Sequence, residues 1–135
     1  MNPRYMLDTD ICIYISKQKP SGVKARFDRL KPGQTVMSVI TYGELCYGAS
    51  KSSQKAKALE HLAGMVQDIP VEYLDSTASE AYGKIRAELE AQGRVIGGND
   101  LWIAAHAMAL DVTLATNNDR EFLRIAGLSV ENWTK

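Results

Sequence analysis

The sequence predicts a single α/β domain with a central parallel sheet of about five strands flanked by helices, and three observations point to it. Short apolar runs alternate along the chain with stretches of helical period, which is the pattern of repeated βαβ units. The length of 135 residues is that of one domain, so residues 1–135 are expected to form one unit. The composition, 45% hydrophobic and 24% charged, excludes disordered and collagen-like chains.

Five apolar runs are the expected strands. They are residues 5–7, 35–40, 69–74, 112–116 and 128–130. Turn-forming residues, Asn2-Pro3 and Lys31-Pro32-Gly33, precede the first two of them. Runs of this length with such boundaries favour strands over buried helices.

The clearest helix is expected over residues 77–91. Apolar side chains recur there at four-residue spacing and include Ile85 and Leu89, while charged residues occupy the opposite face. Thr77 and Glu80 have the spacing of a capping box, so the helix is expected to begin at Thr77.

Three further helices are expected, over residues 11–16, 59–66 and 101–110. Asp10 is the expected cap of the first. The third follows Gly97-Gly98-Asn99 and is almost wholly apolar, which indicates a buried helix. His106 therefore falls in the core, where a hydrogen-bonded structural role is expected, whereas His61 is expected on the surface.

Charge is sorted along the chain although the total is zero. Residues 1–57 carry a net charge of +6 and residues 58–135 a net charge of −6, so a basic surface is compatible with the neutral total. Cys12 and Cys46 lack the number and spacing of a disulfide scaffold or a zinc site, and both are expected to be reduced. Neither a signal peptide nor an apolar run of membrane-spanning length is evident, so a cytoplasmic location is expected.

Four acids lie where strands give way to helices: Asp8, Glu44, Asp100 and Asp119. In a parallel sheet these positions meet at the carboxyl edge, where ligands of open α/β folds bind. Three of the four also suit helix caps, with Glu44 pairing with Thr41 in a capping box, but Asp8 follows an apolar strand where a lone charge is costly to bury. Converging acids repel one another, and Mg²⁺, or Mn²⁺ in its place, would relieve that repulsion.

A carboxylate-held Mg²⁺ at such an edge is typical of enzymes that act on phosphate esters. The metal lowers the pKa of a bound water and neutralises phosphoryl oxygens, so no protein nucleophile is required. This agrees with the sequence, which contains no nucleophile elbow and no P-loop.

Six segments together resemble the PIN domain nucleases, and among them the VapC-type toxins of bacterial toxin-antitoxin systems. The segments are YMLDT (5–9), SVITYGELxYG (38–48), IRAEL (85–89), GxxDxxIAAHA (97–107), ATNNxREF (115–122) and GLxVENW (127–133). They occur in the family's order and span nearly the whole chain.

The resemblance implies a PIN-like, Rossmann-like five-stranded parallel sheet and Mg²⁺-dependent endonucleolytic cleavage of RNA, commonly a structured RNA such as tRNA. Metal-activated water would leave 5′-phosphate and 3′-hydroxyl ends. Asp8 and Asp100 match the family's two most dependable metal ligands, and Glu44 matches the third acid. Thr116 resembles a strand-end hydroxyl that would hydrogen-bond the carboxylates.

The fourth acid is where this sequence departs from the resembled pattern. Many family members place an acid two residues after the position of Thr116, and here that position holds Asn118, with Asp119 one residue further on. Either Asp119 shifts into the site, or three acids and amide oxygens serve there.

The resemblance also implies partners. A VapB-type antitoxin would occupy a groove formed by the first helices and the Glu44 helix, its tail blocking the acids with a basic side chain, and the toxin would inhibit translation. A homodimer is the family's usual state. For RNA, the aromatic candidates are Tyr42 and Tyr47 and the basic candidates include Lys51 and Arg86, although the Lys-rich stretch is equally typical of a solvated helix face.

Two alternatives stay open at this level. Asp8-Thr9-Asp10 imitates the acid pair of haloacid-dehalogenase phosphatases, but their Gly-Thr-Leu is replaced by Ile11-Cys12-Ile13. A phospho-acceptor receiver domain would need an acid after a middle strand, where Asp75 stands, and a lysine after a late strand, which the sequence lacks.

Overall fold

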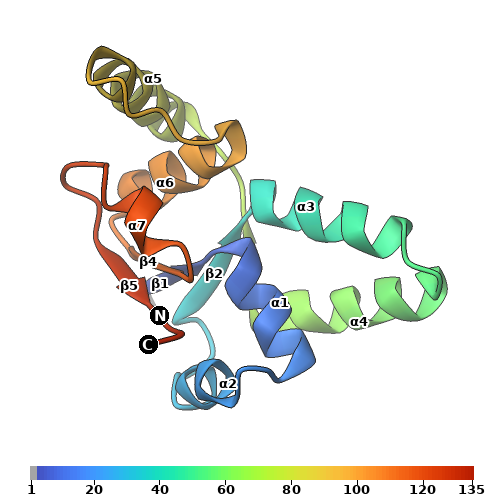
Figure 1. Cartoon of the computed structure of the whole chain (residues 1–135). Coiled ribbons are helices and arrows are strands. Elements are labelled where there is room, and N and C mark those ends of the chain that lie inside the picture. Colours follow the sequence, from blue (N-terminus) through green and yellow to red (C-terminus); the bar gives the residue numbers. More distant parts are fainter. Residues whose placement is uncertain (1–2) are drawn as a thin grey trace.

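The computed structural model describes residues 3–135 and shows a five-stranded parallel sheet with the order β3-β2-β1-β4-β5 (Figure 1). The strands are β1 Tyr5–Leu7, β2 Thr35–Ser38, β3 Val71–Glu72, β4 Thr113–Thr116 and β5 Val130–Asn132. The helices are α1 Thr9–Lys17, α2 Ser21–Asp28, α3 Val39–Ser50, α4 Lys55–Asp68, α5 Ser76–Ala91, α6 Gly98–Leu110 and α7 Asp119–Phe122. The predicted fold class is confirmed, while the turn expected at Asn2-Pro3 begins outside the described residues.

Successive strand residues are buried on opposite faces of the sheet. Met6 of β1 and Leu114 of β4 belong to the core shared with α5, α6 and α7. Their neighbours Leu7 and Ala115 belong to a second core, shared with α1, α2 and Ile69 at the end of α4. Because both faces are covered by helices, the central residues of β1, β2 and β4 are apolar on both faces of the sheet, and the polar residues of β2 and β4 stand at the strand ends.

The order of the strands creates a crevice at the centre of the sheet. The chain builds β1, β2 and β3 outward in one direction, and then returns through α5 and α6 to place β4 on the other side of β1. The carboxyl ends of β1 and β4 therefore flank the point where the topology reverses. Open α/β folds bind their ligands at such a point.

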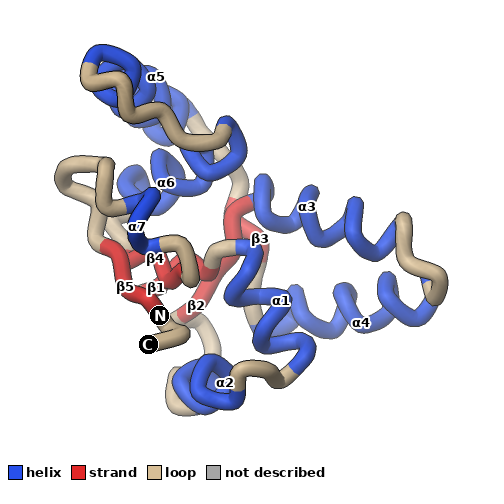
Figure 2. The backbone as a smooth tube through the Cα atoms, in the orientation of Figure 1, coloured by secondary structure: helices blue, strands red, loops and turns tan. Residues whose placement is uncertain are grey.

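The helices α3 and α4 form a hairpin that extends from the sheet, with α1 beside it (Figure 2). A short turn over residues 51–54 joins the two helices, and their side chains pack on each other and on α1. A hollow lies between the three helices.

Several predicted boundaries were wrong because capping residues next to the predicted ones start the helices. Asp75 caps α5 by accepting a hydrogen bond from Ala78 N at 3.0 Å, so the expected capping box at Thr77 does not form. Ser38 caps α3 and ends β2 there, two residues before the predicted end of that strand. Asp8, and not Asp10, caps α1.

The remaining strands also differ from their predicted bounds. The third is limited to Val71–Glu72, the fourth begins at Thr113, and the fifth is displaced to Val130–Asn132. Cys12 is buried, Cys46 is half-buried and both are free thiols, as predicted. Between residues 3 and 135, every helix is too short or too polar to span a bilayer.

Candidate active site

Asp8 sits at the crevice between β1 and β4 with only 5% of its surface exposed. As the cap of α1 it accepts a hydrogen bond on Oδ1 from Thr9 N at 2.8 Å, and its Oδ2 accepts one from the Thr116 hydroxyl at 2.8 Å. Burial raises the pKa of Asp8 to about 6, against the opposing effect of these two hydrogen bonds. Asp8 thus combines the capping role with an environment that disfavours its charge.

Thr116 links Asp8 to the segment that follows β4. While its hydroxyl donates to Asp8, the same oxygen accepts a hydrogen bond from Asn118 N at 2.9 Å. The side-chain amide of Asn118 in turn donates to the carboxylate of Glu121. A chain of hydrogen bonds therefore runs from the end of β1 to α7, and its far end is an acid that the sequence analysis did not select.

Glu44 is held by the first residue of α1. The Thr9 hydroxyl donates to Glu44 Oε1 at 2.6 Å, and the buried Thr41 hydroxyl lies 3.2 Å from Thr9 Oγ1. The alternative in which Glu44 serves only in a capping box with Thr41 does not hold, because Ser38 caps α3 by accepting from Ile40 N at 3.1 Å. Glu44 consequently lies in the second turn of α3 and is free of capping.

Asp100 is the third residue of α6 and is half-buried. It does not cap the helix, since the cap position is Gly97. Burial is the main cause that raises the pKa of Asp100 to about 6, and the negative charges of Asp8, Glu121 and Glu44 raise it further. Four acids from β1, α3, α6 and α7 thus face a common region.

Asp119 lies apart from this group. Its Oδ2 is 3.6 Å from the Nζ of Lys135, and a hydrogen bond from the Asn132 side chain is the main cause that lowers its pKa. The structure brings Asp8, Glu44 and Asp100 together as expected, but it turns Asp119 towards the C-terminal segment and brings Glu121 to the acids instead. Glu121 lies two residues after Asp119, which places it on the opposite side of α7. A helix of four residues is too short for the sequence to show which of the two sides faces the other acids.

The four acids are compatible with a hard divalent cation. Their donor atoms are carboxylate oxygens. Burial is the main cause of the raised pKa values of Asp8 and Asp100, and the negative charges of neighbouring acids, which a cation would neutralise, add to it. Within residues 3–135, no three carboxylate, imidazole or thiol groups already surround one point at ligand distance. Glu44 in particular is engaged by Thr9. The donor chemistry therefore fits Mg²⁺, and side-chain movement would have to complete the coordination.

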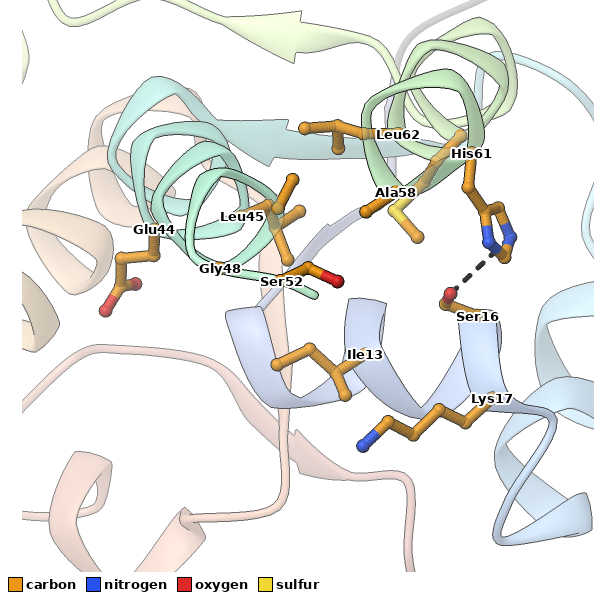
Figure 3. A pocket seen from close by; sticks show the side chains of 12 residues that line it. Ile13, Ser16, Lys17, Glu44, Leu45, Gly48, Ser52, Ala58, His61 and Leu62 are labelled. Atoms are coloured by element: carbon orange, nitrogen blue, oxygen red, sulfur yellow. Dashed lines mark hydrogen bonds between the residues drawn. The ribbon is translucent and has the colours of Figure 1, made fainter. Parts of the chain in front are cut away.

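A groove with a volume of about 480 Å³ runs between α1, α3 and α4 (Figure 3). Its walls are largely apolar and include Ile13, Leu45 and Leu62, with Lys17 near one end. Glu44, one of the four acids, lines the groove at another end, and its carboxylate points away from the other lining side chains (Figure 3). This surface is therefore continuous with the candidate active site.

His61 lines the same groove and is exposed, as predicted, with its Nε2 3.5 Å from Ser16 Oγ. His106 is buried, with its Nδ1 2.9 Å from Ser38 Oγ, so the expected structural histidine is confirmed. Desolvation lowers the pKa of His106, and the ring contacts Ser38, the cap of α3.

Of the four residues suggested for RNA contact, Tyr47 and Lys51 lie together at the surface, whereas Tyr42 and Arg86 are engaged elsewhere. Tyr47 is 66% exposed, and Lys51 Nζ lies 5.2 Å from the centroid of its ring on the α3 side of the acids. Tyr42 instead is half-buried and packs against the second core. Arg86 is engaged on α5, where it donates to Glu90 at 3.0 Å and to the Tyr82 hydroxyl at 2.9 Å.

A sequence profile of the PIN domain matches residues 5–128, which is nearly the whole described chain. The chain is 44% identical over 131 residues to the tRNA(fMet)-specific endonuclease VapC of Shigella flexneri, covering 97% of this chain and 98% of that protein. The chain belongs to the VapC group of the PIN domain family. It is also 42% identical over 132 residues to ribonuclease VapC1 of Haemophilus influenzae strain R2866, with the same coverage.

Solved structures support the assignment to the VapC group. DNA-bound VapBC from Salmonella typhimurium contains a chain that superposes with a TM-score of 0.91 at 39% identity, covering 97% of this chain and 98% of that one. VapBC-1 from nontypeable Haemophilus influenzae gives a TM-score of 0.88 at 41% identity over the same shares. Both structures are toxin-antitoxin complexes of the VapBC type.

Membership of the VapC group decides between the alternatives that the sequence left open. Neither the phosphatase nor the receiver domain accounts for similarity over nearly the whole chain. Asp75, on which the receiver alternative depended, is engaged as the cap of α5. Asp10 is exposed on the first turn of α1, and its charge contributes to the raised pKa values of Asp8 and Asp100.

Proposed function

We propose that this VapC-family protein is a Mg²⁺-dependent endoribonuclease and the toxin of a type II toxin-antitoxin pair. It acts in the cytoplasm on a structured RNA such as tRNA and thereby inhibits translation. The observation that carries the proposal is the convergence of Asp8, Glu44 and Asp100, with Glu121 beside them, at the crevice between β1 and β4. The names of the relatives, a tRNA(fMet)-specific endonuclease and a ribonuclease, support the same activity.

Asp8, Asp100 and Glu44 would hold the metal in this proposal. When bound, Mg²⁺ supplies a more acidic water and neutralises charge on the phosphoryl oxygens. Mn²⁺ suits the same oxygen donors and would substitute for it.

The protein's own residues keep the acids in place for this chemistry. Thr116 and Thr9 N fix both oxygens of Asp8, so that its side chain cannot rotate away from the crevice. Thr9 Oγ1 restrains Glu44, which ties α3 to the start of α1. Glu121 keeps negative charge next to Asp100, and Asn118 orients that charge.

Asp8→Asn and Asp100→Asn test the proposal. The wild-type protein is expected to cleave RNA in the presence of Mg²⁺ and to leave 5′-phosphate and 3′-hydroxyl ends, whereas each variant loses cleavage with its fold intact. Asp111→Asn is the matched control, because Asp111 is exposed, ends α6 with φ 56°, and tolerates Asn in that conformation. Sequencing of RNA ends in bacteria that express the wild type or Asp8→Asn identifies the substrate. Full activity in both variants contradicts the metal assignment.

We also propose that a VapB-type antitoxin occupies the groove between α1, α3 and α4. The apolar walls suit an amphipathic segment, and the contact of the groove with Glu44 gives a basic side chain of that segment access to the acids. The VapBC complexes among the structural relatives support such a partner. We expect the free toxin to be a homodimer, which light scattering of the purified protein tests.

A further inference from the structure

A second hollow, with a volume of about 540 Å³, lies between α3 and the start of α6. It is lined by Val39, Ile40, Gly43, Glu44, Tyr47 and Asn99. It shares only Glu44 with the groove between α1, α3 and α4, so the two hollows open on different sides of α3. The acids therefore have a second neighbouring surface that the antitoxin proposal does not use.

Glycine at position 43 makes this hollow possible. Val39, Gly43 and Tyr47 are spaced by one helical turn each and form a single stripe along α3. A Cβ atom at Gly43 would meet no heavy atom within 4 Å, so packing inside the protein does not require a glycine there. Glycine inside a helix costs about 0.5–1 kcal/mol relative to alanine. Its effect on the surface is to leave a recess between Val39 and the ring of Tyr47.

Tyr47 presents an aromatic ring to that recess. Although it is a large side chain in a helix with a buried face, 66% of its surface is exposed. Lys51, one turn further along α3, places its Nζ 5.2 Å from the centroid of the ring. Asn99 lines the opposite wall and offers both amide donors and a carbonyl acceptor.

We infer that this hollow is a nucleobase subsite, in which an unpaired base of the RNA substrate stacks on Tyr47 above Gly43. The inference rests on the proposed ribonuclease activity and adds the part of the substrate that is bound next to the reaction. Aromatic rings in proteins bind unpaired bases by stacking, and amide side chains hydrogen-bond their edges. Lys51 would meet the phosphate attached to that base.

The charges around the hollow favour a base over a phosphate in this position. Glu44 contributes a carboxylate to the wall, which would repel a phosphate placed in the recess. A base is neutral and can lie against Glu44 while its own phosphate extends towards Lys51. A protein segment suits this hollow less well than the apolar groove on the other side of α3, which has Ile13, Leu45 and Leu62 in its walls.

The experiment measures binding in an Asp100→Asn background, which is expected to bind RNA without cutting it. The probe is a single-stranded RNA that carries 2-aminopurine, whose fluorescence falls when the base stacks. Gly43→Leu fills the recess and Tyr47→Ala removes the ring, and each is expected to weaken binding by about 5- to 100-fold and to abolish the fluorescence change. Tyr47→Phe keeps the ring and is expected to retain both.

Gly83→Leu is the matched control. Gly83 is an exposed helical glycine on α5, where an added Cβ also meets no heavy atom within 4 Å, so it reports on the substitution without touching the hollow. Leucine is a better helix former than glycine, so neither Gly43→Leu nor Gly83→Leu is expected to lower the melting temperature. Tyr47→Ala keeps the test valid if the leucine at position 43 perturbs Glu44.

An abasic nucleotide moved along the RNA probe identifies the bound base. At one position of the probe, the abasic nucleotide is expected to weaken binding to the Asp100→Asn protein that retains Tyr47. The same nucleotide should not weaken binding to Tyr47→Ala any further, because the same stacking contact is lost in both cases. Unchanged RNA binding in Gly43→Leu and Tyr47→Ala overturns the subsite but not the proposed function. The same conclusion follows if these two variants bind RNA normally and lose only the binding of an isolated VapB-type antitoxin. If the wild type neither binds nor cleaves RNA, the subsite and the proposed function both fail.

Discussion

Thr116 donates a hydrogen bond of 2.8 Å to Asp8 from a position 108 residues further along the chain. Thr116 ends β4 and Asp8 follows β1, and these strands pair in parallel register through Leu7 and Ala115. The bond therefore joins the two sides of the crevice at its base. It connects Asp8, which follows β1, to the start of the loop that follows β4. Because it is buried and one partner is an acid, this contact influences both the geometry and the protonation of Asp8.

Thr116→Val is expected to weaken metal binding near neutral pH by about tenfold. The hydrogen bond from Thr116 lowers the pKa of Asp8, so its loss raises that pKa further above about 6 and makes the metal compete with a proton. Mn²⁺ titrations at several pH values measure the effect, which should shrink as the pH rises. Thr116→Ser keeps the hydroxyl and is the matched control. A loss of affinity that is constant at all pH values contradicts this explanation.

Asp8→Asn is expected to stabilise the metal-free protein at pH 7 by about 1–2 kcal/mol, since one pKa unit corresponds to about 1.4 kcal/mol. The folded pKa of Asp8, about 6, lies above the ordinary value of 3.8. Between about pH 4 and pH 6 the folded chain therefore holds more protons than the unfolded chain, and its stability falls as the pH rises. Asn cannot ionise and avoids this loss.

Urea unfolding of the metal-free proteins at pH 4 and pH 7 measures the difference. The stabilisation by Asp8→Asn should be present at pH 7 and absent at pH 4, where Asp8 of the wild type is already neutral. Added Mg²⁺ should stabilise the wild type at pH 7 and leave Asp8→Asn unchanged. Equal stability of the two proteins at pH 7 without metal would show that burial of the ionised Asp8 carboxylate does not destabilise the wild type.

Most of this site could be predicted from where acids fall relative to strands. Asp8 and Asp100 follow or precede elements whose ends must meet at one edge of a parallel sheet, so their proximity follows from topology. Glu121 could not be selected in the same way. The direction of its side chain depends on the residue at which α7 begins, and a helix of four residues leaves too little periodicity to read.

The errors at the starts of α1, α3 and α5 share one physical cause. Ser38, Asp75 and Asp8 each accept a hydrogen bond from an amide of the following helix, and each stands near another residue that can also cap a helix. Backbone conformation decides that competition, and it depends on where the preceding strand stops pairing. Sequence patterns therefore predicted most of the helices and the faces that they bury, but not their first residues, and α2 was not predicted at all.

Glu121→Gln is expected to reduce RNA cleavage by at least about tenfold, whereas Asp119→Asn is expected to stay within about threefold of the wild type. Glu121 acts on the pKa of Asp100 and is oriented by Asn118, while Asp119 faces Lys135 and Asn132. Initial rates of Mg²⁺-dependent cleavage compare the two variants. If Asp119→Asn reduced cleavage more than Glu121→Gln, Asp119 would be the fourth acid of the site, and α7 would have to rotate when metal binds.

Gly48→Leu is expected to weaken neutralisation by the antitoxin by about tenfold or more. Gly48 lines the groove between α1, α3 and α4, and a Cβ there meets no heavy atom within 4 Å, so leucine fills the groove without displacing the protein's own atoms. The lost volume removes apolar contact from the partner, since each buried CH₂ contributes about 0.8 kcal/mol. Titration of the purified antitoxin into both proteins measures the affinity, with Gly83→Leu as the control. Unchanged affinity would place the antitoxin on another surface, and the hollow beside Tyr47 is then the next surface to test.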